Sequence, residues 1–470
     1  MTTRKLVLQA ILRQNLAAFT EKTFHTVSPS DRLLPNWHIT VIADHLERCY
    51  RGEIKRLIIT MPPRSMKSIC ASIAFPCWVL GKDPSRRIIC ASYGTELSAK
   101  FSRDAKAVME SEWYRDTFDR TRLARSAEQD LMTTKMGGRY ATSVGGALTG
   151  RGGNIIIIDD PMKPQEGQSE TTRTTVNQWF DGTLYSRLDS KAEDVIIIVM
   201  QRLHVDDLVA HVMDKEEWEH LDLPAIATVD QSFELSNGSR FDRREGEVLH
   251  PERESIQVLD NIKSNIGSFN FDAQYQQQPV PVEGNLIKWS WFPFYEMPPP
   301  HEHGNRIIQS WDTASKATEL SDYSVCTTWL IKGNDYFLLD VFRKRLEFPA
   351  LQQAVINHIR KWNVSTVLIE DTASGTALIQ NLRNQSVPTI TKPIAVKPKD
   401  DKVVRMSTQS AKIEAGHVHL PRSAPWLDEF RKELLAFPNG QHDDQVDSLS
   451  QFLNWFENPR RIYMKQLSGL

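Results

Sequence analysis

A lysine and a serine stand side by side where an apolar run gives way to a helical pattern. The apolar run covers residues 56–61, the helical pattern covers residues 67–80, and Lys67 and Ser68 lie at the junction. A lysine at this place in a phosphate-binding loop contacts the β- and γ-phosphates of a nucleotide, and the hydroxyl beside it binds Mg²⁺. The same short string also fits an ordinary strand–helix turn with a solvated lysine, so it does not identify a nucleotide site by itself.

The loop departs from the usual phosphate-binding pattern, because Met61 and Met66 occupy the positions of its two glycines. The two prolines that follow Met61 have no N–H group. The phosphate-binding amides are therefore expected at the N-terminus of the helix, where the helix dipole favours anions. The ATP-binding residues predicted in this loop are Arg64, Ser65, Met66, Lys67 and Ser68.

Two adjacent aspartates follow a second apolar run. Residues 154–159 contain four consecutive isoleucines before Asp159, and Asp160 comes next. A buried strand of this kind typically places one carboxylate beside Mg²⁺ and a second beside the attacking water, as in a Walker B segment. We expect Asp159 to bind Mg²⁺ together with Ser68, and Asp160 to act as the catalytic residue that orients water. An Asp-Asp-Pro string is also a common turn at a strand end, but its combination with the loop favours nucleotide hydrolysis.

A third apolar run, residues 194–200, carries a polar residue at its tip, Gln201. A side chain at the end of a neighbouring strand is well placed to sense the γ-phosphate, so we add Gln201 to the predicted ATP-binding residues. Asp206 and Asp207 follow shortly afterwards. They are more typical of the N-cap and first-turn acid of the next helix.

Carboxylates on three separated segments form a second candidate site. Asp312 ends one apolar run and Glu370 ends another. A late helical pattern opens with acids three and four residues apart, which places them on one helix face. These acids are Asp443, Asp444 and Asp447, and His442 precedes them as either an orienting residue or an ordinary surface histidine.

Acids drawn together from distant parts of a chain repel one another, and cations must neutralise them. Oxygen ligands of this kind suit Mg²⁺ or Mn²⁺, and two such ions about 4 Å apart promote phosphodiester cleavage. Each acid also has a plainer interpretation, as a loop acid, an N-cap or a first-turn acid. We expect Asp312, Glu370 and Asp444 to be catalytic. The metal ligands are expected among Asp312, Glu370, Asp443, Asp444 and Asp447, and the sequence leaves open which of the last three binds metal.

The elements that must hold these residues fall into two groups. From residue 54, β-branched runs alternate with helical patterns such as residues 96–110, which predicts a parallel sheet with helices on both faces. From residue 306, three strands in a meander with a turn at residues 333–335 precede helix, strand, helix and strand. This order is typical of a ribonuclease H-like fold with a mixed sheet.

Residues between the two groups are rich in Gln, Pro and aromatic side chains, including the string Gln274-Tyr275-Gln276-Gln277-Gln278-Pro279. They are interpreted as a connecting region. The predicted fold class is thus α/β. The predicted organisation is an N-terminal P-loop ATPase domain (residues 1–230), a connecting or lid region with a linker (231–300) and a ribonuclease H-like nuclease domain (301–470).

Composition limits what such a chain can be. The 470 residues carry 57 Lys and Arg against 59 Asp and Glu, a net charge of −2, with 40% hydrophobic residues. These values exclude intrinsic disorder and an overall basic nucleic-acid coat, so any attraction for DNA phosphate is local. No apolar run approaches the roughly 18 residues of a membrane span. The 5 cysteines form no C-x-x-C pair, which favours reduced thiols in a cytosolic compartment.

In combination and order, these segments resemble the terminase large subunit of tailed bacteriophages. The resemblance runs from about residue 37 to residue 453, and Gln201-Arg202-Leu203-His204 is similar to the family's coupling segment. The motifs that carry it are Pro-Pro-Arg-x-x-Lys-Ser, Ile-Ile-Asp-Asp-Pro, Trp-Asp-Thr-Ala, Ile-Glu-Asp and His-Asp-Asp-Gln-Val-Asp.

By this resemblance, an ATPase moves viral double-stranded DNA into the procapsid, and a nuclease that uses Mg²⁺ or Mn²⁺ cuts concatemeric DNA. The implied cofactors are ATP and Mg²⁺. The implied partners are the portal protein, the small terminase subunit and other copies of the chain in a pentameric ring. The implied location is the host bacterial cytoplasm, without a membrane.

The resemblance also implies that an arginine from a neighbouring subunit completes each ATP site. The candidates, in order, are Arg151, Arg139 and Arg64. Trp37 and His38 are expected near the adenine, unless they are core residues. Two basic clusters are candidate DNA-phosphate contacts, although a solvated charged face is the commoner interpretation of either. One comprises Lys397, Lys399, Lys402 and Arg405, and the other comprises Lys344 and Arg345.

Two other functions fit the same motifs. A recombination or repair nuclease joined to an ATPase, such as a junction resolvase, has both sites and prefers branched DNA. A capsid–portal interaction subunit whose nucleotide site has decayed through Met61 and Met66 binds no nucleotide. The host, the mode of cutting (headful or site-specific) and the oligomeric state of the isolated chain are not determined by the sequence.

Overall fold

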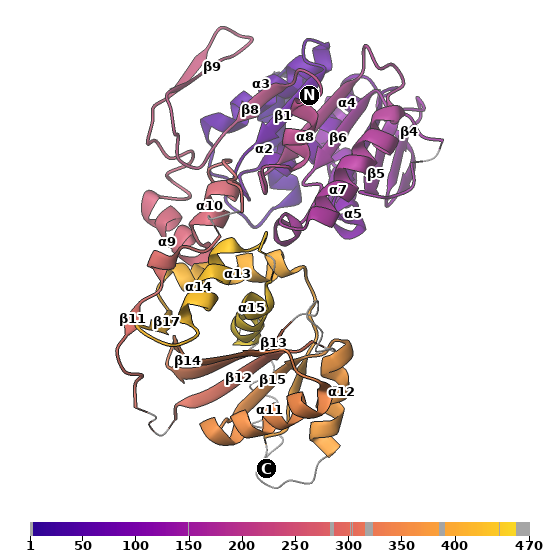
Figure 1. Cartoon of the computed structure of the whole chain (residues 1–470). Coiled ribbons are helices and arrows are strands. Elements are labelled where there is room, and N and C mark those ends of the chain that lie inside the picture. Colours follow the sequence, from indigo (N-terminus) through magenta and orange to yellow (C-terminus); the bar gives the residue numbers. More distant parts are fainter. Residues whose placement is uncertain are drawn as a thin grey trace. The chain divides into compact units, whose positions relative to one another are not determined.

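The structure, a computed structural model, describes residues 3–148, 150–282, 286–300, 302, 304–314, 323–384, 391–440 and 442–456. It divides into two compact units (Figure 1). Unit 1 contains Met1–Asn261 and Asn270–Val280, and unit 2 contains Ile262–Phe269 and Pro281–Leu470. The chain therefore passes between the units more than once, and residues 231–300 are divided between them.

Unit 1 is built on a sheet that has eight strands in the described part of the chain, in the order β3-β4-β5-β2-β6-β7-β1-β8. The strands from β5 to β8 in this order are parallel, and β3 and β4 form an antiparallel edge. Their bounds are β1 (Arg56–Thr60), β2 (Arg87–Ser92), β3 (Leu123–Ala127), β4 (Asp130–Thr133), β5 (Gly138–Ser143), β6 (Ile155–Asp159), β7 (Val195–Met200) and β8 (Glu219–Asp222).

The strands β1, β6 and β7 confirm the three apolar runs described in this half of the sequence. Every residue of β6 and β7 is buried, as expected for strands covered on both faces. The edge strands β3, β4 and β5 were not predicted. β3 is almost entirely exposed and the other two alternate buried and less buried positions, so none of them contains an apolar run.

Helices cover both faces of this sheet, because alternate residues of each strand point to opposite sides. Ile157 and Ile197 belong to the core beneath the N-terminal helices, and Ile158 and Ile198 belong to the core on the other face. The helices and short helical segments are α1 (Thr3–Gln14), α2 (Leu16–Val27), α3 (Trp37–Arg51), a π-helix (Ile69–Ala74), α4 (Phe75–Lys82), α5 (Thr95–Glu110), α6 (Glu112–Thr117), α7 (Glu170–Trp179), α8 (Leu208–Met213) and η2 to η4 (Pro164–Glu166, Phe180–Leu184 and Tyr185–Arg187).

A hairpin and two helices follow β8 in the region expected as a connector. The hairpin pairs β9 (Gln231–Glu234) with β10 (Arg240–Arg243). The helices are α9 (Ile256–Ile266) and α10 (Ser268–Gln274), and both contain residues of each unit.

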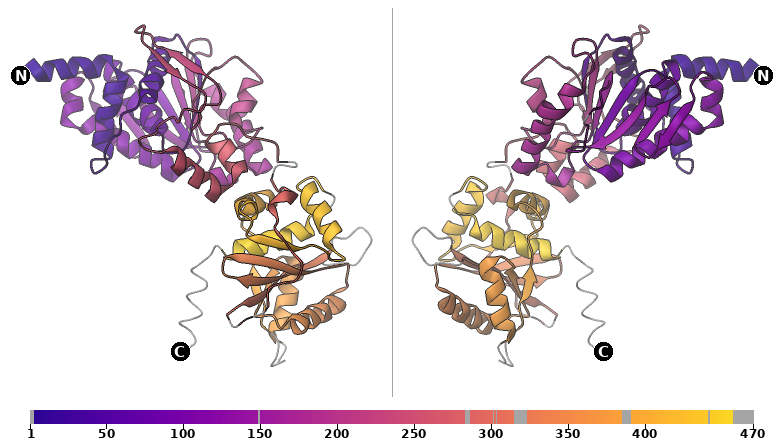
Figure 2. Two further views of the ribbon diagram at one scale, coloured as in Figure 1. Left: turned by 90° about the vertical axis from the view of Figure 1, so that its left-hand side faces the viewer. Right: turned by 90° about the vertical axis from the view of Figure 1, so that its right-hand side faces the viewer.

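Unit 2 has a mixed sheet that, among the described residues, contains seven strands in the order β11-β17-β14-β13-β12-β15-β16. Helices lie on both faces of this sheet (Figure 2). The elements are η5 (Trp289–Trp291), β11 (Phe294–Tyr295), β12 (Arg306–Asp312), β13 (Ser324–Lys332), β14 (Asp335–Lys344), α11 (Phe348–Trp362), β15 (Thr366–Glu370), α12 (Ala373–Asn384), β16 (Ile394–Val396), α13 (Lys402–Glu414), β17 (Val418–Pro421), α14 (Leu427–Ala436) and α15 (Asp444–Phe456).

The predicted order of unit 2 is confirmed: β12, β13 and β14 form an antiparallel meander, and α11, β15, α12 and β16 follow. The two short strands β11 and β17 were not predicted, since two to four residues give no periodicity. β16 is shorter than the predicted run, whose first two residues lie outside the described part of the chain. Across the described residues, no helix combines the length and apolar character needed to span a bilayer.

Candidate functional site

The predicted phosphate-binding loop joins β1 to the π-helix. Met61 extends β1, since its N–H donates to the Met200 carbonyl over 3.2 Å. Arg64 and Met66 adopt positive φ angles of 58° and 70°. Met66 therefore takes the left-handed backbone that a glycine adopts freely, at a cost of roughly 1–2 kcal/mol. The loop therefore differs from the usual pattern in the side chain of this residue, whereas its backbone makes the turn that a glycine would make.

The loop lies against the predicted aspartates. β7 lies between β1 and β6, and the carboxyl ends of these parallel strands meet at one edge of the sheet. Lys67 Nζ donates to Asp160 Oδ1 at 2.9 Å, and Ser68 Oγ donates to Asp159 Oδ1 at 3.0 Å. Ser72, one turn further, donates to Asp159 Oδ2 at 2.6 Å.

Burial, with Asp160 nearby as the second cause, raises the pKa of Asp159 to about 7. The carboxylate is 1% exposed and accepts hydrogen bonds from two serines. Asp160 adopts a positive φ of 45°, which turns the chain sharply at the end of β6. A nucleotide-bound Mg²⁺ would supply the positive charge that favours the ionised form of Asp159.

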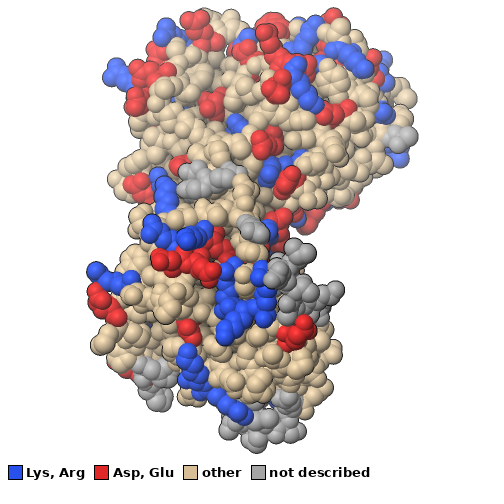
Figure 3. All heavy atoms as spheres, viewed as in Figure 1, with Lys and Arg blue, Asp and Glu red and all other residues tan. Residues whose placement is uncertain are grey.

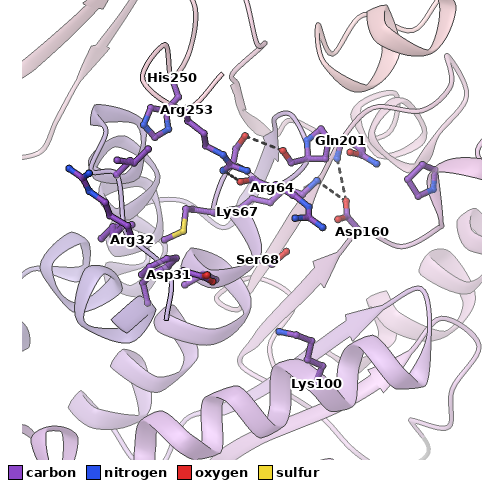
Figure 4. A pocket seen from close by; sticks show the side chains of 18 of the residues that line it. Asp31, Arg32, Arg64, Lys67, Ser68, Lys100, Asp160, Gln201, His250 and Arg253 are labelled. Atoms are coloured by element: carbon purple, nitrogen blue, oxygen red, sulfur yellow. Dashed lines mark hydrogen bonds and ion pairs between the residues drawn. The ribbon is translucent and has the colours of Figure 1, made fainter. Parts of the chain in front are cut away.

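A cavity of about 840 Å³ opens beside the loop (Figure 4). This volume lies within the usual range for small-molecule sites. Its lining includes these residues of the predicted ATP site: Arg64, Ser65, Met66, Lys67, Ser68, Asp160 and Gln201. It also includes these residues that sequence reasoning missed: Asp31, Arg32, Leu33, Leu34, Tyr93, Lys100, His250 and Arg253.

Trp37 and His38, expected near the adenine, do not line this cavity. Trp37 stacks on Phe233 of the hairpin with ring centroids 5.4 Å apart and packs against the core. His38 is buried beneath the loop, with Nε2 at 3.3 Å from the Ser65 carbonyl oxygen. Burial lowers the pKa of His38 to about 3. Trp37 packs against the core and His38 is buried, which favours the alternative stated above, that they are core residues.

Gln201 is buried at the tip of β7 and lines the cavity. Its backbone N–H donates to Asp160 Oδ1 at 3.4 Å, and its side-chain Oε1 has no hydrogen-bond partner among the described residues. Asp207, and not Asp206, is the N-cap of α8: it accepts from the Ala210 N–H at 3.3 Å, one residue later than the predicted N-cap. It also pairs with Arg202 at 2.8 Å.

The three candidate arginines lie in different places. Arg64 lines the cavity of its own chain. Arg139 is 1% exposed and donates to the Ser72 carbonyl oxygen over 3.1 and 3.3 Å, so it is unavailable to a neighbouring copy and that candidate was wrong. Arg151 is exposed at the amino end of β6, opposite the end that carries Asp159.

A fourth arginine was not predicted. Arg253 lines the cavity and donates a hydrogen bond to the Arg64 carbonyl oxygen in the phosphate-binding loop. It lies in a turn of the connecting region, where no periodic pattern marks it in the sequence.

The second candidate site is assembled by two neighbouring strands and a helix. β12 and β15 are parallel partners with Trp311 opposite Ile369, so Asp312 and Glu370 leave the sheet side by side. α15 is fastened to β12 because Ser448 Oγ donates to the Ser310 carbonyl oxygen at 2.8 Å. This places the first turn of α15, with its acids, near the ends of both strands.

The carboxylates of this site repel one another. Burial raises the pKa of Asp312 well above its ordinary value, and Glu370, Asp447 and Asp444 raise it further, in that order. Burial also raises the pKa of Asp447 to about 6, against the opposing effect of Arg405. The structure therefore brings Asp312, Glu370, Asp444 and Asp447 within electrostatic reach.

Arg405 lies among these acids. Its guanidinium contacts Glu370 Oε2 at 3.2 Å and Asp447 Oδ1 at 2.8 Å. Asp443 stands apart, in an ion pair with Lys402. As they stand, no three His, Cys, Asp or Glu side chains in the described ranges are grouped closely enough to hold a metal ion. The four acids fit a divalent cation in type and charge, and an arginine now provides the neutralising charge.

Two of the predicted basic residues, Lys402 and Arg405, thus pair with acids of the site. Lys397 has a side chain that is 80% exposed. The predicted Arg345 belongs to a cluster nearby: Arg345 and the unpredicted Arg343 stack on the Tyr323 ring at 4.1 and 3.7 Å, and His442 contacts the same ring at 5.2 Å. Figure 3 shows Lys and Arg side chains gathered on one face of unit 2.

Comparisons with known proteins find the same fold. Residues 309–456 match the family model described as the terminase RNaseH-like domain. A large terminase from a thermophilic bacteriophage, solved in complex with ATP-gamma-S, superposes with a TM-score of 0.51 at 11% identity. This superposition covers 92% of this chain and 98% of that chain.

The chain has the fold of a phage large terminase. This confirms the predicted fold class and the resemblance to the terminase large subunit. The HK97 bacteriophage large terminase matches with a TM-score of 0.36 at 11% identity, over 87% of this chain and 90% of that chain. The large terminase nuclease from thermophilic phage G20c with bound magnesium matches with a TM-score of 0.29 at 14% identity, over 37% of this chain and 98% of that chain. No curated protein sequence matches this chain significantly.

Proposed function

We propose that this chain is a terminase large subunit that couples ATP hydrolysis to the movement of viral double-stranded DNA into a procapsid and cuts concatemeric DNA with a two-metal nuclease. The observation that carries the proposal is the pairing of Lys67 with Asp160 beside a nucleotide-sized cavity, in a chain of terminase fold. The acids beside Asp312, within the matched terminase domain, support the nuclease half.

In the ATPase reaction, Lys67 exchanges its ion pair with Asp160 for the β- and γ-phosphates. Asp160 is then free to accept a hydrogen bond from the attacking water, and Gln201, whose Oε1 is unpaired among the described residues, lines the same cavity. Ser68 and Asp159 are the residues that would hold Mg²⁺, which neutralises phosphate charge when it is bound. The thermophilic bacteriophage terminase of similar fold was solved in complex with ATP-gamma-S, which supports a nucleotide as the ligand of this chain.

In the nuclease reaction, Asp312, Glu370, Asp444 and Asp447 would hold the Mg²⁺ or Mn²⁺ ions, which activate water and stabilise the leaving oxygen when bound. Arg405 releases Glu370 and Asp447 as the ions bind, and its charge becomes available to a DNA phosphate. Asp443 joins the ligands only after Lys402 releases it. The basic side chains around Tyr323 lie beside this site and suit a DNA backbone.

The remaining parts of the proposal concern the assembly. The chain acts as a pentameric ring on the portal, with the small terminase subunit, in the cytoplasm of a bacterial host. Arg151 of one copy reaches the ATP site of the next. The exposure of Arg151 away from the ATP site of its own copy supports this role.

Paired variants test both halves in the full chain. Lys67→Ala removes the phosphate contact, so we expect ATP hydrolysis to fall at least 100-fold while Mn²⁺-dependent plasmid cleavage persists. Asp312→Asn removes a ligand without adding bulk, so we expect cleavage to be lost while ATP hydrolysis persists. Lys106→Ala, at a half-buried lysine of α5 that pairs with Glu110, is the matched control.

Each result has a clear opposite. Unchanged ATP hydrolysis by Lys67→Ala rejects the nucleotide site, and full nicking by Asp312→Asn rejects the metal site. Preferential cleavage of branched junctions over linear duplex favours the recombination nuclease instead of a terminase.

A further inference from the structure

A glutamine of the connecting region lies against the segment that leaves the nucleotide site. Gln277 belongs to the glutamine-rich string at residues 274–279 and is 4% exposed. Its φ angle is +57°, in the left-handed region. A residue other than glycine is strained in this conformation, so the contacts around it must fix it there.

Both ends of the Gln277 side-chain amide are used. Its Oε1 accepts a hydrogen bond from the Arg202 backbone N–H at 2.9 Å. Its Nε2 donates to the Gln274 carbonyl oxygen at 2.6 Å, which orients the amide group. Gln277 therefore links the segment after β7 to the end of α10, 75 residues further along the chain.

The amide one residue before Arg202 points to a different partner. The Gln201 N–H donates to Asp160 Oδ1 at 3.4 Å, and the same oxygen accepts from Lys67 Nζ at 2.9 Å. Of these two successive backbone N–H groups, that of Gln201 therefore bonds to the proposed phosphate site and that of Arg202 bonds to the connecting region. In the proposed reaction, Lys67 leaves Asp160 for phosphate. Any movement of Gln201 that follows changes the orientation of the next peptide group, whose N–H is hydrogen bonded to Gln277.

The rest of this segment is held firmly. The Arg202 guanidinium pairs with the fully buried Asp207 at 2.8 Å. Asp207 also accepts from the Leu203 N–H at 3.1 Å and caps α8. The segment is thus fixed on that side, and Gln277 adds a hydrogen bond at the Arg202 amide, directly after Gln201.

The neighbouring glutamine has a different role. Gln276 Oε1 accepts from the Ile226 N–H at 3.0 Å, and its Nε2 donates to the Ile226 carbonyl oxygen at 3.1 Å. These bonds attach the string to the body of unit 1 without touching the residues after β7. Residues 270–280 belong to unit 1 and are continuous at both ends with residues of unit 2.

We propose that Gln277 is a positioning residue for ATP hydrolysis, which holds the Arg202 amide so that Gln201 stays beside Asp160 and which ties the nucleotide site to the chain segment that continues into unit 2. This inference rests on the proposed ATPase function. Gln277 acts through Gln201 and does not itself contact the nucleotide.

Steady-state ATP hydrolysis by the full chain tests the proposal. Gln277→Met keeps the length of the side chain but removes both hydrogen bonds. Gln277→Gly also removes them and adopts the positive φ without strain. For both variants we expect kcat to fall roughly tenfold, which is about 1.4 kcal/mol of transition-state stabilisation, with the KM for ATP within about twofold of wild type because the phosphate-binding loop is intact.

Gln276→Met is the matched control and is expected to keep the wild-type kcat. Hydrogen exchange at the Arg202 amide provides a second readout, and we expect it to be faster in Gln277→Met than in Gln276→Met. Melting temperatures of all three variants are measured first, and Gln277→Gly serves if Gln277→Met does not fold.

Three outcomes overturn the proposal: a wild-type kcat in both Gln277 variants, an equal loss in Gln276→Met, or a rise in KM as large as the fall in kcat. None of these depends on Lys67→Ala. If Lys67→Ala abolishes hydrolysis and the Gln277 variants behave as wild type, the positioning role alone fails. If Lys67→Ala hydrolyses ATP normally, the proposed function fails first.

Discussion

The ion pair between Lys67 and Asp160 shows how single residues prepare the nucleotide site. At 2.9 Å it holds two groups with different partners in the proposed reaction, phosphate for the lysine and water for the carboxylate. Asp159 beside them is buried and hydrogen bonded to Ser68 and Ser72. A ligand that draws Lys67 away therefore frees Asp160 without disturbing Asp159.

A buried histidine beneath the phosphate-binding loop makes folding sensitive to acid. Burial lowers the pKa of His38 from 6.5 to about 3. The unfolded chain therefore binds a proton that the folded chain does not, so this contribution to stability is complete above pH 6.5 and is lost as the pH falls toward 3. For one proton, the free energy of unfolding changes by about 1.4 kcal/mol per pH unit in this range.

Between pH 6.5 and about 4, His38 lowers the melting temperature as the pH falls, while buried acids with a raised folded pKa, such as Asp159 and Asp447, act in the opposite direction. We therefore expect His38→Gln to shift the slope of melting temperature against pH toward greater stability in acid, relative to wild type. Burial also lowers the pKa of His45 and His220, so part of the slope remains. Thermal denaturation at a series of pH values measures this. His25→Gln, at an exposed position of α2, should keep the wild-type slope. An identical slope in His38→Gln rejects the assignment to this histidine.

Among the secondary-structure elements, α15 decides whether the nuclease acids meet. Its buried Ser448 and Gln451 bond to Ser310 of β12, which fixes the register between the helix and the strand. The acids of the first turn then lie at the ends of β12 and β15. This placement lowers the stability of the fold, because it brings several carboxylates that repel one another into one buried region, with Arg405 between them.

We expect Mg²⁺ or Mn²⁺ to raise the melting temperature of the wild-type chain above pH 6, because a cation offsets this repulsion. The folded pKa of Asp312 and Asp447 lies above the unfolded value, so their contribution to stability is present below pH 3.8 and is lost as the pH rises through the folded pKa, about 6 for Asp447. The metal effect should therefore shrink as the pH is lowered.

Asp312→Asn checks this expectation. It should raise the melting temperature in chelator and remove most of the increase caused by metal. Asp340→Asn, whose partner is Lys361 elsewhere in unit 2, is the matched control and should keep the increase. An unchanged metal response in Asp312→Asn shows that the ions stabilise the chain at another place.

For the whole molecule, the direction of the parallel strands separates Arg151 from the ATP site. Arg151 precedes β6, and Asp159 and Asp160 end it. The Arg151 guanidinium stacks on Tyr140 at 3.8 Å and pairs with Asp130 at 3.3 Å on the exposed surface. The role proposed for Arg151 therefore requires the ATP site of a neighbouring copy.

Mixing variants tests this arrangement. Arg151→Ala and Lys67→Ala should each hydrolyse ATP poorly, but a mixture should recover activity, because the intact loop of the first receives the arginine of the second. The recovery should disappear on dilution below the assembly concentration. Arg125→Ala, which also pairs with Asp130, is the control and should hydrolyse ATP as wild type does. No recovery in mixtures that assemble rejects Arg151 as the shared residue.

Sequence alone determined the strands that carry the two sites, because short apolar runs rich in β-branched residues favour buried strands, and the acids that end parallel strands share one edge of a sheet. Asp159, Asp160, Asp312 and Glu370 were predictable for this reason. The tertiary structure decided which polar residues pair across large separations. Arg405 with Glu370, Asp443 with Lys402 and Gln277 with Arg202 have no periodic signature, since each pair depends on how separate elements pack.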